Sequence, residues 1–193
     1  MASSNLGWRE LPYAALPASI DDRTLQFTEL PNAGRRVRLI SGLRSATDVT
    51  RGEEPQLIGL FSPLHRHVLS ENYTVILPSS HSKHVRASFG CIVDFTTVLT
   101  GKLFGLLTGT STLANPADPG FATESFIAGV RESRDLGLST ALFKTRARIV
   151  LGSMPGSHAQ AFLSGVLIGA ELLTLAVGPS PPLVLAAGPD LAR

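Results

Sequence analysis

The sequence predicts an α/β fold in which a mixed sheet is covered by helices. Short runs rich in β-branched and aromatic residues, such as Val37–Ile40 and Tyr73–Leu77, lie in the first half of the chain. Segments of helical length and periodicity dominate the second half. With 44% apolar and 17% charged residues, the chain of 193 residues has enough material for a packed core.

In chain order, the strand Val37–Ile40 is followed by a polar loop and by a helix that begins over Gln56–Leu60. The strand Tyr73–Leu77 comes next, and residues His84–Phe95 alternate around Gly90 as in a hairpin. The expected later elements are helices over Leu99–Leu107, Glu124–Arg134, Ser139–Leu151 and Ser157–Val177, and a strand over Leu183–Ala186. Strands first and helices later are typical of one sheet with helices packed on it.

Composition and charge exclude several classes of protein. The net charge is only +2, and the one basic cluster, Arg35–Arg38, fits a strand edge or a loop, so we expect no nucleic-acid partner. The single cysteine, Cys91, excludes an intrachain disulfide and indicates a reducing compartment. The apolar tract Ala161–Val177 contains Ser164 and Glu171 and is short for a membrane span, and no signal peptide is apparent. We therefore expect a cytoplasmic protein without a membrane partner.

The stretch Asp48–Gly59 carries the strongest chemical signal. Three carboxylates and an arginine lie around a glycine, and an apolar run follows at once. Pro55 fits the first turn of a helix, which places Glu53 and Glu54 at the positive end of the helix dipole. This crowding suits proton transfer or the handling of metal and phosphate, and the alternative is an acidic helix cap on a solvated face.

This stretch resembles the signature Asp-Val-Met-Arg-Gly-Glu-Glu-Thr-Gln-Leu-Ile-Gly of the 2-dehydro-3-deoxygalactonate kinases. Four further segments resemble family motifs in the family's order: Ser4–Trp8 with Pro12-Tyr13 and Pro17-Ala18, Leu77–Lys83, Asp94–Leu103, and Phe162–Glu171. The similarity covers nearly the whole chain. It implies a partial actin-like sugar-kinase fold of the ribonuclease H-like type.

The resemblance also implies how the chain is organised. Residues 1–60 are expected to be the remnant of a first lobe with the sugar-acid pocket and the signature loop, and residues 61–193 a second, nucleotide-side lobe shortened at its C-terminal end. Family members begin with Asp-Trp-Gly-Thr-Thr-x-x-Arg, which holds ATP phosphate and magnesium, and no segment here supplies it. We therefore expect the middle part of a kinase, truncated at both ends.

By resemblance, the activity is ATP-dependent phosphorylation of 2-dehydro-3-deoxy-D-galactonate to its 6-phosphate in galactonate catabolism, with Mg²⁺. The alternative is a non-catalytic remnant that retains only part of the sugar-acid pocket. In such a fragment, strands without their neighbours would expose backbone groups and an apolar face, so self-association is expected.

The signature stretch supplies the candidate catalytic residues. Phosphoryl transfer to a hydroxyl needs a carboxylate that receives its proton, and Asp48, followed by Glu53, is the candidate general base. An Asx turn is the alternative role for Asp48. Arg51 suits bidentate binding of a substrate carboxylate, or alternatively an ion pair with Glu53 or Glu54.

Two other groups of residues are candidates by resemblance. Ser4, Asn5 and Trp8 match the sugar-acid pocket of the family, although a lone tryptophan is also a common core or interface anchor. The candidate nucleotide and phosphate contacts are Ser79, Ser80, Lys83 and Gly188. Small polar loops present backbone N–H groups to phosphate, although serines stand here where the family has Gly-Thr. Lys83 is either a phosphate contact or an ordinary exposed lysine.

Histidines and helix glycines give weaker signals. The spacing of His65, His67, His81 and His84 is compatible with a metal, but no carboxylate flanks them, and we expect no metal site formed by protein ligands alone. Gly165 and Gly169 are four residues apart, which favours close packing of their helix on the sheet over ligand binding.

Overall fold

The computed structural model describes residues 11–19, 25–30, 36–61, 71–113, 122–175 and 181–188. These residues form two compact units. The first, the sheet unit, contains the described residues up to Pro78 together with Lys83–Thr97 and the C-terminal segment from Pro181. The second, the helical unit, contains Ser79–Ser82 and the described residues between Val98 and Ser180. The predicted division into lobes at residue 60 stays a prediction.

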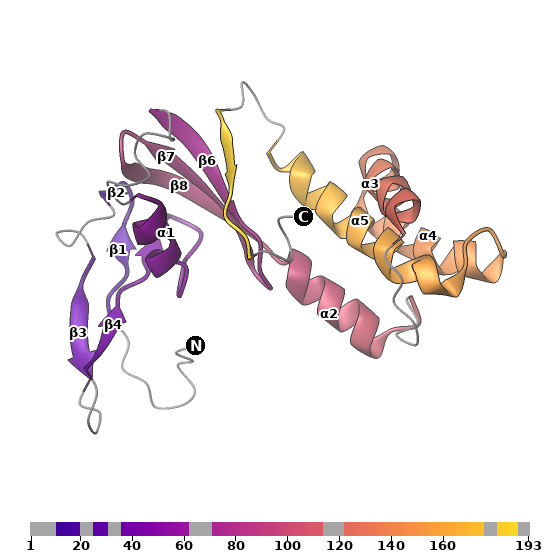
Figure 1. The fold of residues 1–193 in the computed structure, drawn as a ribbon, viewed down its shortest axis with the longest axis horizontal. Coiled ribbons are helices and arrows are strands. Elements are labelled where there is room, and N and C mark those ends of the chain that lie inside the picture. The colour runs from indigo at the N-terminus through magenta and orange to yellow at the C-terminus, as the bar shows by residue number, and fades with distance from the viewer. Residues whose placement is uncertain are drawn as a thin grey trace. The chain divides into compact units, whose positions relative to one another are not determined.

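A mixed five-stranded sheet forms the centre of the sheet unit, as predicted (Figure 1). In spatial order its strands are β2 (Ala18–Ser19), β8 (Cys91–Val98), β7 (Ser82–Ser88), β6 (Asn72–Leu77) and β9 (Leu183–Leu185). Strand β6 pairs antiparallel with β7 and parallel with β9, with Val75 opposite Val184. The predicted strands Tyr73–Leu77 and Leu183–Ala186 are confirmed, and the structure adds that they are neighbours in one sheet.

Two small ribbons complete the strands of this unit. Strand β3 (Phe27–Leu30) pairs antiparallel with β4 (Val37–Ile40), the strand that the sequence predicted. Strand β1 (Ala14–Ala15) pairs parallel with β5 (Leu43–Arg44). The sequence did not reveal β1, β2, β3 or β5, because runs of two to four residues carry too little periodicity to identify.

A tight turn joins β7 to β8 at the predicted place. Both turn residues, Phe89 and Gly90, have positive φ angles of 49° and 80°. Two-residue hairpin loops with positive φ at both positions match the twist of the strands that they connect. Glycine adopts such angles freely, whereas Phe89 does so at a cost.

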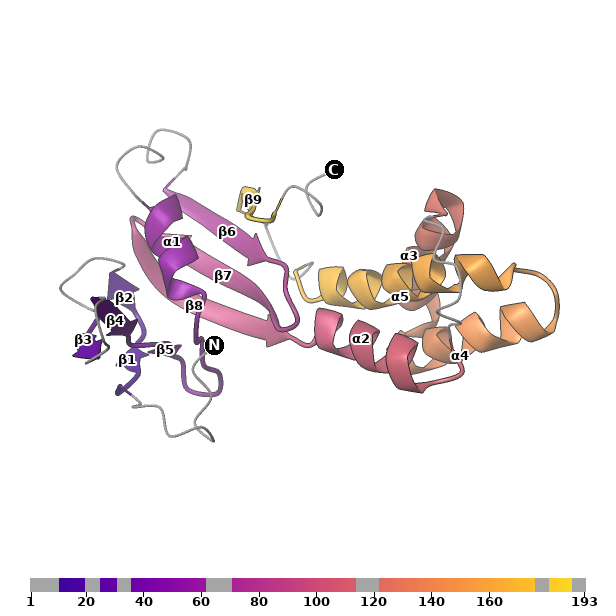
Figure 2. The same cartoon turned by 60° about the horizontal axis from the view of Figure 1, so that its bottom comes forward.

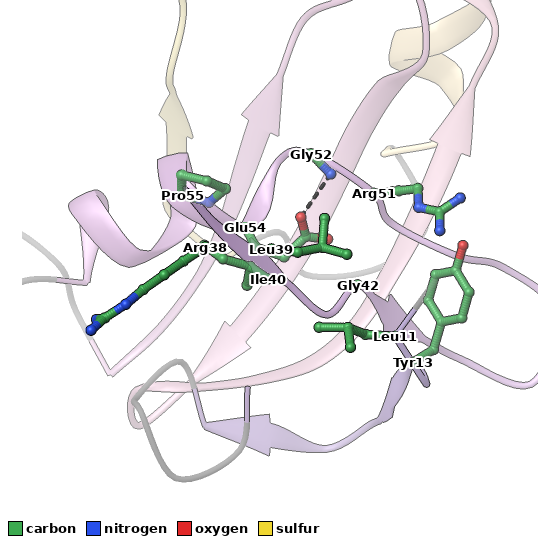
Figure 3. Close-up of a pocket in the computed structure, with 10 residues that line it drawn as sticks. All are labelled: Leu11, Tyr13, Arg38, Leu39, Ile40, Gly42, Arg51, Gly52, Glu54 and Pro55. Atoms are coloured by element: carbon green, nitrogen blue, oxygen red, sulfur yellow. Dashed lines mark hydrogen bonds between the residues drawn. The ribbon is translucent and has the colours of Figure 1, made fainter. Parts of the chain in front are cut away.

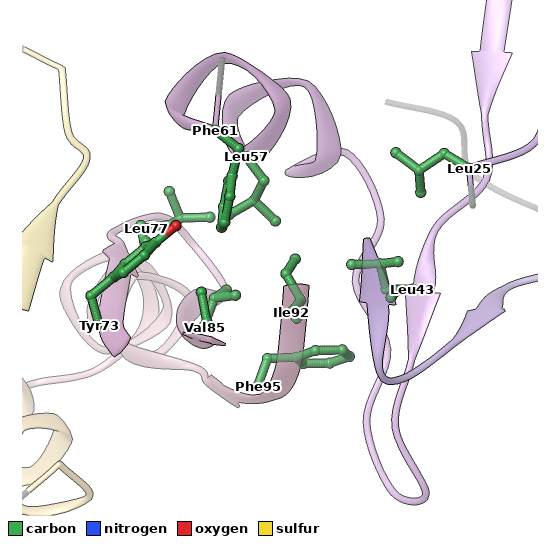
Figure 4. Packing of buried hydrophobic residues seen from close by; sticks show 12 residues of the cluster. Leu25, Leu43, Leu57, Phe61, Tyr73, Leu77, Val85, Ile92 and Phe95 are labelled. Carbon is green, nitrogen blue, oxygen red and sulfur yellow. The ribbon is translucent and has the colours of Figure 1, made fainter. Parts of the chain in front are cut away.

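Helix α1 (Glu54–Leu60) closes the core of the sheet unit. Figure 4 shows Leu57 of this helix and Phe61 just beyond it pointing toward Tyr73, Leu77 and other buried side chains of the sheet. The Phe61 and Tyr73 rings lie 5.6 Å apart, and burial raises the pKa of Tyr73 to about 12. Each such buried apolar side chain contributes about 1.5–3 kcal/mol, so this contact holds α1 and the loop before it on the sheet.

The helical unit contains all the longer helices (Figure 2). They are α2 (Thr100–Thr110), α3 (Thr123–Leu136), α4 (Leu138–Val150) and α5 (Ala159–Leu173), with a 3₁₀ turn at Gly156–His158 before α5. All four predicted helices are confirmed, although α5 begins two residues later than expected and ends at Leu173. Most of α5 is buried, as its almost uninterrupted apolar sequence requires. Across the described residues, no helix is long and apolar enough to cross a membrane.

Helices α3 and α5 cross so closely that glycine is needed on both sides. A Cβ atom on Gly165 would lie 2.0 Å from the carbonyl oxygen of Phe126, and one on Gly129 would lie 2.1 Å from that of Phe162. Gly169 has a similar contact, 2.9 Å from the Cα atom of Val130. The predicted close packing is confirmed, but its partner is helix α3 and not the sheet.

This crossing gives a test of stability. Gly165→Ala should lower the free energy of unfolding by about 1–3 kcal/mol, because the added methyl group forces two backbones apart. Gly105→Ala is the matched control, since nothing lies within 4 Å of a Cβ atom at Gly105 on α2. The control should be neutral or stabilising by up to about 1 kcal/mol. Denaturant unfolding measures both, and equal shifts in the two variants would contradict the packing.

Candidate functional site

The signature loop, residues 45–53, leaves the sheet unit's β5 as a tight hairpin. The amide of Thr50 donates to the carbonyl of Leu43, and the amide of Ser45 donates to the carbonyl of Asp48, each at 2.9 Å. The Ser45 hydroxyl accepts the amides of Thr47 and Asp48 at 3.2 and 3.0 Å. These bonds fold the chain back on itself, so that the loop leads directly into α1.

Asp48 ties this hairpin to the sheet. Its Oδ1 accepts the amide of Val49 at 2.7 Å and the hydroxyl of Thr97 at 2.8 Å. Its Oδ2 accepts the amide of Thr97 at 2.6 Å. Thr97 lies on β8, 49 residues along the chain. An Asx turn was one of the two roles predicted for Asp48. Its carboxylate also bonds to a distant strand, so a local turn does not describe its whole role.

Lys83 lies next to this junction and is 5% exposed. Its ammonium donates to the carbonyl of Val49 at 2.8 Å and to the hydroxyl of Thr97 at 2.5 Å. The alternative of an ordinary exposed lysine is therefore wrong, because the side chain is buried and bonded. A contact to phosphate stays a prediction.

A second carboxylate, that of the buried Glu54, holds the other end of the loop. Thr50 is fully buried, and its hydroxyl accepts the amide of Leu43 at 3.1 Å and donates to Oε1 of Glu54 at 2.6 Å. The amide of Gly52 donates to Oε2 at 2.7 Å. Gly52 has a φ of 108°, which favours glycine. With Glu54 3% exposed, the alternative of a wholly solvated acidic helix cap does not hold for this residue.

Glu53 is placed differently from both of these carboxylates. It is the N-cap residue of α1 and is half-buried. Its Oε2 accepts the amide of Arg51 at 2.9 Å. A carboxylate has about four acceptor positions, so this one bond leaves the side chain with spare capacity to accept a proton.

A pocket of about 530 Å³ opens beside the loop, entirely within the sheet unit (Figure 3). Its lining residues are Leu11, Tyr13, Arg38, Leu39, Ile40, Gly42, Arg51, Gly52, Glu54 and Pro55. The guanidinium carbon of Arg51 lies 5.8 Å from the centre of the Tyr13 ring. A volume of this size falls in the range of small-molecule sites.

The two arginines of the pocket have different surroundings. Figure 3 shows Arg51 beside the Tyr13 ring, with Arg38 extending away at the opposite end of the pocket. Arg38 lies on β4, and its Nε pairs with Glu29 at 3.3 Å. This strand pairs with β3 as part of a two-stranded ribbon, which agrees with the predicted strand-edge position of the basic cluster.

Gly42 allows the pocket wall to form. A Cβ atom there would lie 2.2 Å from the carbonyl oxygen of Thr50 and 2.7 Å from the Tyr13 ring. The signature loop and the aromatic ring therefore both press against a bare backbone. Any side chain at this position would displace the Tyr13 ring, over which the Arg51 guanidinium lies.

Residues Ser79–Ser82 of the predicted phosphate loop belong to the helical unit, whereas Lys83 belongs to the sheet unit. The Ser79 hydroxyl accepts the amide of His81 at 3.2 Å and donates to the carbonyl of the same residue at 2.9 Å. The carbonyl of Ser80 accepts the amide of Lys102 on α2 at 2.8 Å. Ser82, which is buried, donates to Glu171 of α5 at 2.5 Å. The loop is thus fixed by α2 and α5, and the amide of His81 points back into the loop.

The remaining predicted residues are only partly placed. Ser4, Asn5 and Trp8 lie outside the described residues, as do His65 and His67. Gly188 is exposed, and its role at the adenine side stays a prediction. Over the part of the chain that the structure describes, no group of three His, Cys, Asp or Glu side chains could hold a metal ion.

Sequence reasoning included Thr50, Thr97 and Tyr13 in the family motifs but assigned no role to them, and it did not distinguish the environment of Glu54 from that of Glu53. A weak signal existed for Thr50, because a hydroxyl four residues before a carboxylate at a helix start can bond to it. No local signal existed for Thr97 or Tyr13, because their partners lie far along the chain.

Comparison with known proteins identifies the family of the chain. The whole chain, residues 1–193, matches the family model described as 2-keto-3-deoxy-galactonokinase. The chain belongs to this family. It is similar to the 2-dehydro-3-deoxygalactonokinase of Escherichia coli (strain K12), with 35% identity over 203 residues, which cover 99% of this chain and 65% of the relative.

Two further comparisons point to the same 2-keto-3-deoxy-galactonokinase family. A Rhizobium meliloti (strain 1021) protein, assigned as 2-dehydro-3-deoxygalactonokinase DgoK1, is 32% identical over 186 residues, which cover 89% of this chain and 58% of that protein. A crystal structure of a protein from Sinorhizobium meliloti, assigned as a 2-dehydro-3-deoxygalactonokinase, matches with a TM-score of 0.81 and 31% identity. The match covers 97% of this chain and 64% of that one. The chain therefore spans less than two thirds of the length of each of these relatives.

Thr50 provides a test of how the site is held together. Thr50→Val should lower the free energy of unfolding by about 2–4 kcal/mol, because it leaves the buried amide of Leu43 without a partner and removes the donor to Oε1 of Glu54. Thr47→Val is the matched control on the exposed tip of the same loop. Chemical denaturation of both variants decides the matter, and a Thr50→Val variant as stable as the control would refute the bonding described.

Proposed function

We propose that the protein is a kinase that transfers the γ-phosphoryl group of ATP to 2-dehydro-3-deoxy-D-galactonate and forms the 6-phosphate. Membership of the family over the whole chain carries this proposal. The names of the two sequence relatives describe the same activity. The comparisons give no support to the alternative of a non-catalytic remnant. Because the chain spans 65% and 58% of these relatives, the proposal concerns the full-length protein.

We extend the proposal to the architecture. An actin-like kinase places its sugar-acid pocket and its nucleotide site on two lobes, here residues 1–60 and 61–193. The mixed sheet and the TM-score of 0.81 to a protein assigned to the same kinase class support it. Ser79, Ser80 and Gly188 remain the proposed nucleotide-side contacts. A cytoplasmic location and self-association of the isolated chain also remain predictions.

Arg51 is the proposed ligand of the substrate carboxylate. It lines the pocket, lies over an aromatic ring and is exposed, so its guanidinium can face a solute. The loop on either side is fixed by the carboxylates of half-buried Asp48 and buried Glu54, which reduces the entropy lost on binding. A planar guanidinium binds a carboxylate through two parallel hydrogen bonds, which selects a sugar acid over a neutral sugar.

Glu53 is our proposed general base, with Asp48 as the alternative. Asp48 already accepts three hydrogen bonds, two of them from Thr97. Glu53 accepts one hydrogen bond, from the amide of Arg51. Arg51 precedes it by two residues and lines the pocket. A base must offer a free lone pair to the hydroxyl that reacts, and this favours Glu53. Asp48 then has the task of holding the loop.

The Mg²⁺ that the resemblance implies would neutralise phosphate charge when bound with ATP. The chain's own contribution, on this proposal, is to bind the sugar acid and to accept its proton.

The role of Arg51 can be tested with the full-length protein. Wild type should release ADP only when both ATP and the sugar acid are present. Arg51→Gln should raise the KM for the sugar acid about 10–150-fold, the loss expected for a hydrogen bond to a charged group, with the KM for ATP unchanged. Arg38→Gln is the control, because Arg38 already pairs with Glu29. A wild type without this activity would refute the proposed function. A raised KM in Arg38→Gln alone would show that Arg38, and not Arg51, binds the substrate carboxylate.

The general base can be tested in the same assay. Glu53→Gln should lower kcat by about 10²–10⁴ while KM changes little, which is the range for a lost general base. Asp48→Asn should lower thermal stability, because the NH2 group of the new side chain would face hydrogen-bond donors. Its kcat should fall less than that of Glu53→Gln. A collapse of kcat in Asp48→Asn together with a nearly normal Glu53→Gln would return the role to Asp48.

A further inference from the structure

We propose that Lys83 and Thr97 are positioning residues of the sugar-acid site, which hold the signature loop against the sheet. This differs from the role in phosphate binding that sequence resemblance gave to Lys83. The inference rests on the proposed function for the identity of the substrate. Its structural part depends only on contacts within the sheet unit.

Strand geometry directs Lys83 inward. Alternate residues of a strand face the same side of a sheet. On β7, Lys83 therefore shares its face with Val85 and Ala87, which are 0% and 3% exposed and belong to the core under α1. On β8, Thr97 shares its face with buried Phe95. The two polar side chains extend the core face up to the signature loop.

The hydrogen bonds between them have a defined direction. The Lys83 ammonium can only donate, so the Thr97 hydroxyl accepts from it at 2.5 Å. The hydroxyl then donates its own proton to Oδ1 of Asp48 at 2.8 Å, while the amide of Thr97 donates to Oδ2 at 2.6 Å. An ammonium, a hydroxyl and a carboxylate thus form a chain of charge-assisted bonds, which are stronger than neutral ones.

The same ammonium also holds the backbone of the loop. It donates to the carbonyl of Val49 at 2.8 Å, two residues before Arg51. A buried ammonium is costly unless it is paired and hydrogen-bonded, and both partners shown here fix the signature loop. Release of the loop at Val49 would move Arg51 relative to the Tyr13 ring. Displacements of about 1 Å in a binding group can cost about 10²-fold in rate.

Kinetics of the full-length protein distinguish the two roles of Lys83. Lys83→Met should raise the KM for the sugar acid about tenfold or more and lower kcat, with the KM for ATP within about twofold of wild type. Thr97→Val should act in the same way, and Thr97→Ser should restore most of the activity because it keeps the hydroxyl. Lys102→Met is the control, as Lys102 is an exposed lysine on α2. A raised KM for ATP with an unchanged KM for the sugar acid would overturn the proposal.

Amide hydrogen exchange provides a measurement independent of activity. In Lys83→Met, the amides of Thr50, Gly52 and Thr97 should exchange about tenfold faster or more, because each belongs to the loop or to its anchor. Amides of α3 should be unchanged. Should Lys83→Met not fold, Thr97→Val gives the same comparison. Unchanged exchange around the loop would overturn the positioning role, and a wild type without kinase activity would refute only the proposed function.

Discussion

The signature loop keeps its shape because two carboxylates, the half-buried Asp48 and the buried Glu54, bond to threonine hydroxyls and backbone amides. Asp48 bonds to Thr97 at one end of the loop, and Glu54 bonds to Thr50 at the other. A carboxylate removed from solvent needs donors in fixed positions, so few loop conformations satisfy both ends together. The pocket wall, the direction of Arg51 and the start of α1 all depend on this constraint.

The loop consequently divides its charged groups between two tasks. Asp48 and Glu54 hold the loop through hydrogen bonds to Thr97, Val49, Thr50 and Gly52, whereas Arg51 and Glu53 are the residues to which we assign contacts with the ligand. The core under α1 supplies the rigidity, since Leu57 packs on the sheet three residues after Glu54. On the proposed function, the sugar-acid site is largely formed before the substrate arrives, which lowers the cost of binding.

Much of the fold followed from the sequence, because strands such as Tyr73–Leu77 and the helices of the second half have clear periodicity. The residue types of the signature loop also marked it as the candidate site, and the role of Arg51 stays a prediction. The burial of Lys83 could in principle have been predicted from strand alternation, because Lys83 lies two residues before the apolar Val85. Its hydrogen bond to Thr97 could not. Contacts such as Asp48 with Thr97 join residues 49 positions apart, and a single sequence holds no local trace of them. For the same reason, the sequence did not predict that helix α3 packs against Gly165.

A crystal structure of the full-length protein with 2-dehydro-3-deoxygalactonate bound would test the central claim most directly. The account predicts that the carboxylate of the sugar acid lies within hydrogen-bonding distance, about 2.7–3.2 Å, of the Arg51 guanidinium. It also predicts that the bonds among Asp48, Thr97 and Lys83 are unchanged by the ligand. A sugar acid bound away from Arg51, or a signature loop that releases Asp48 from Thr97 to receive it, would contradict the account.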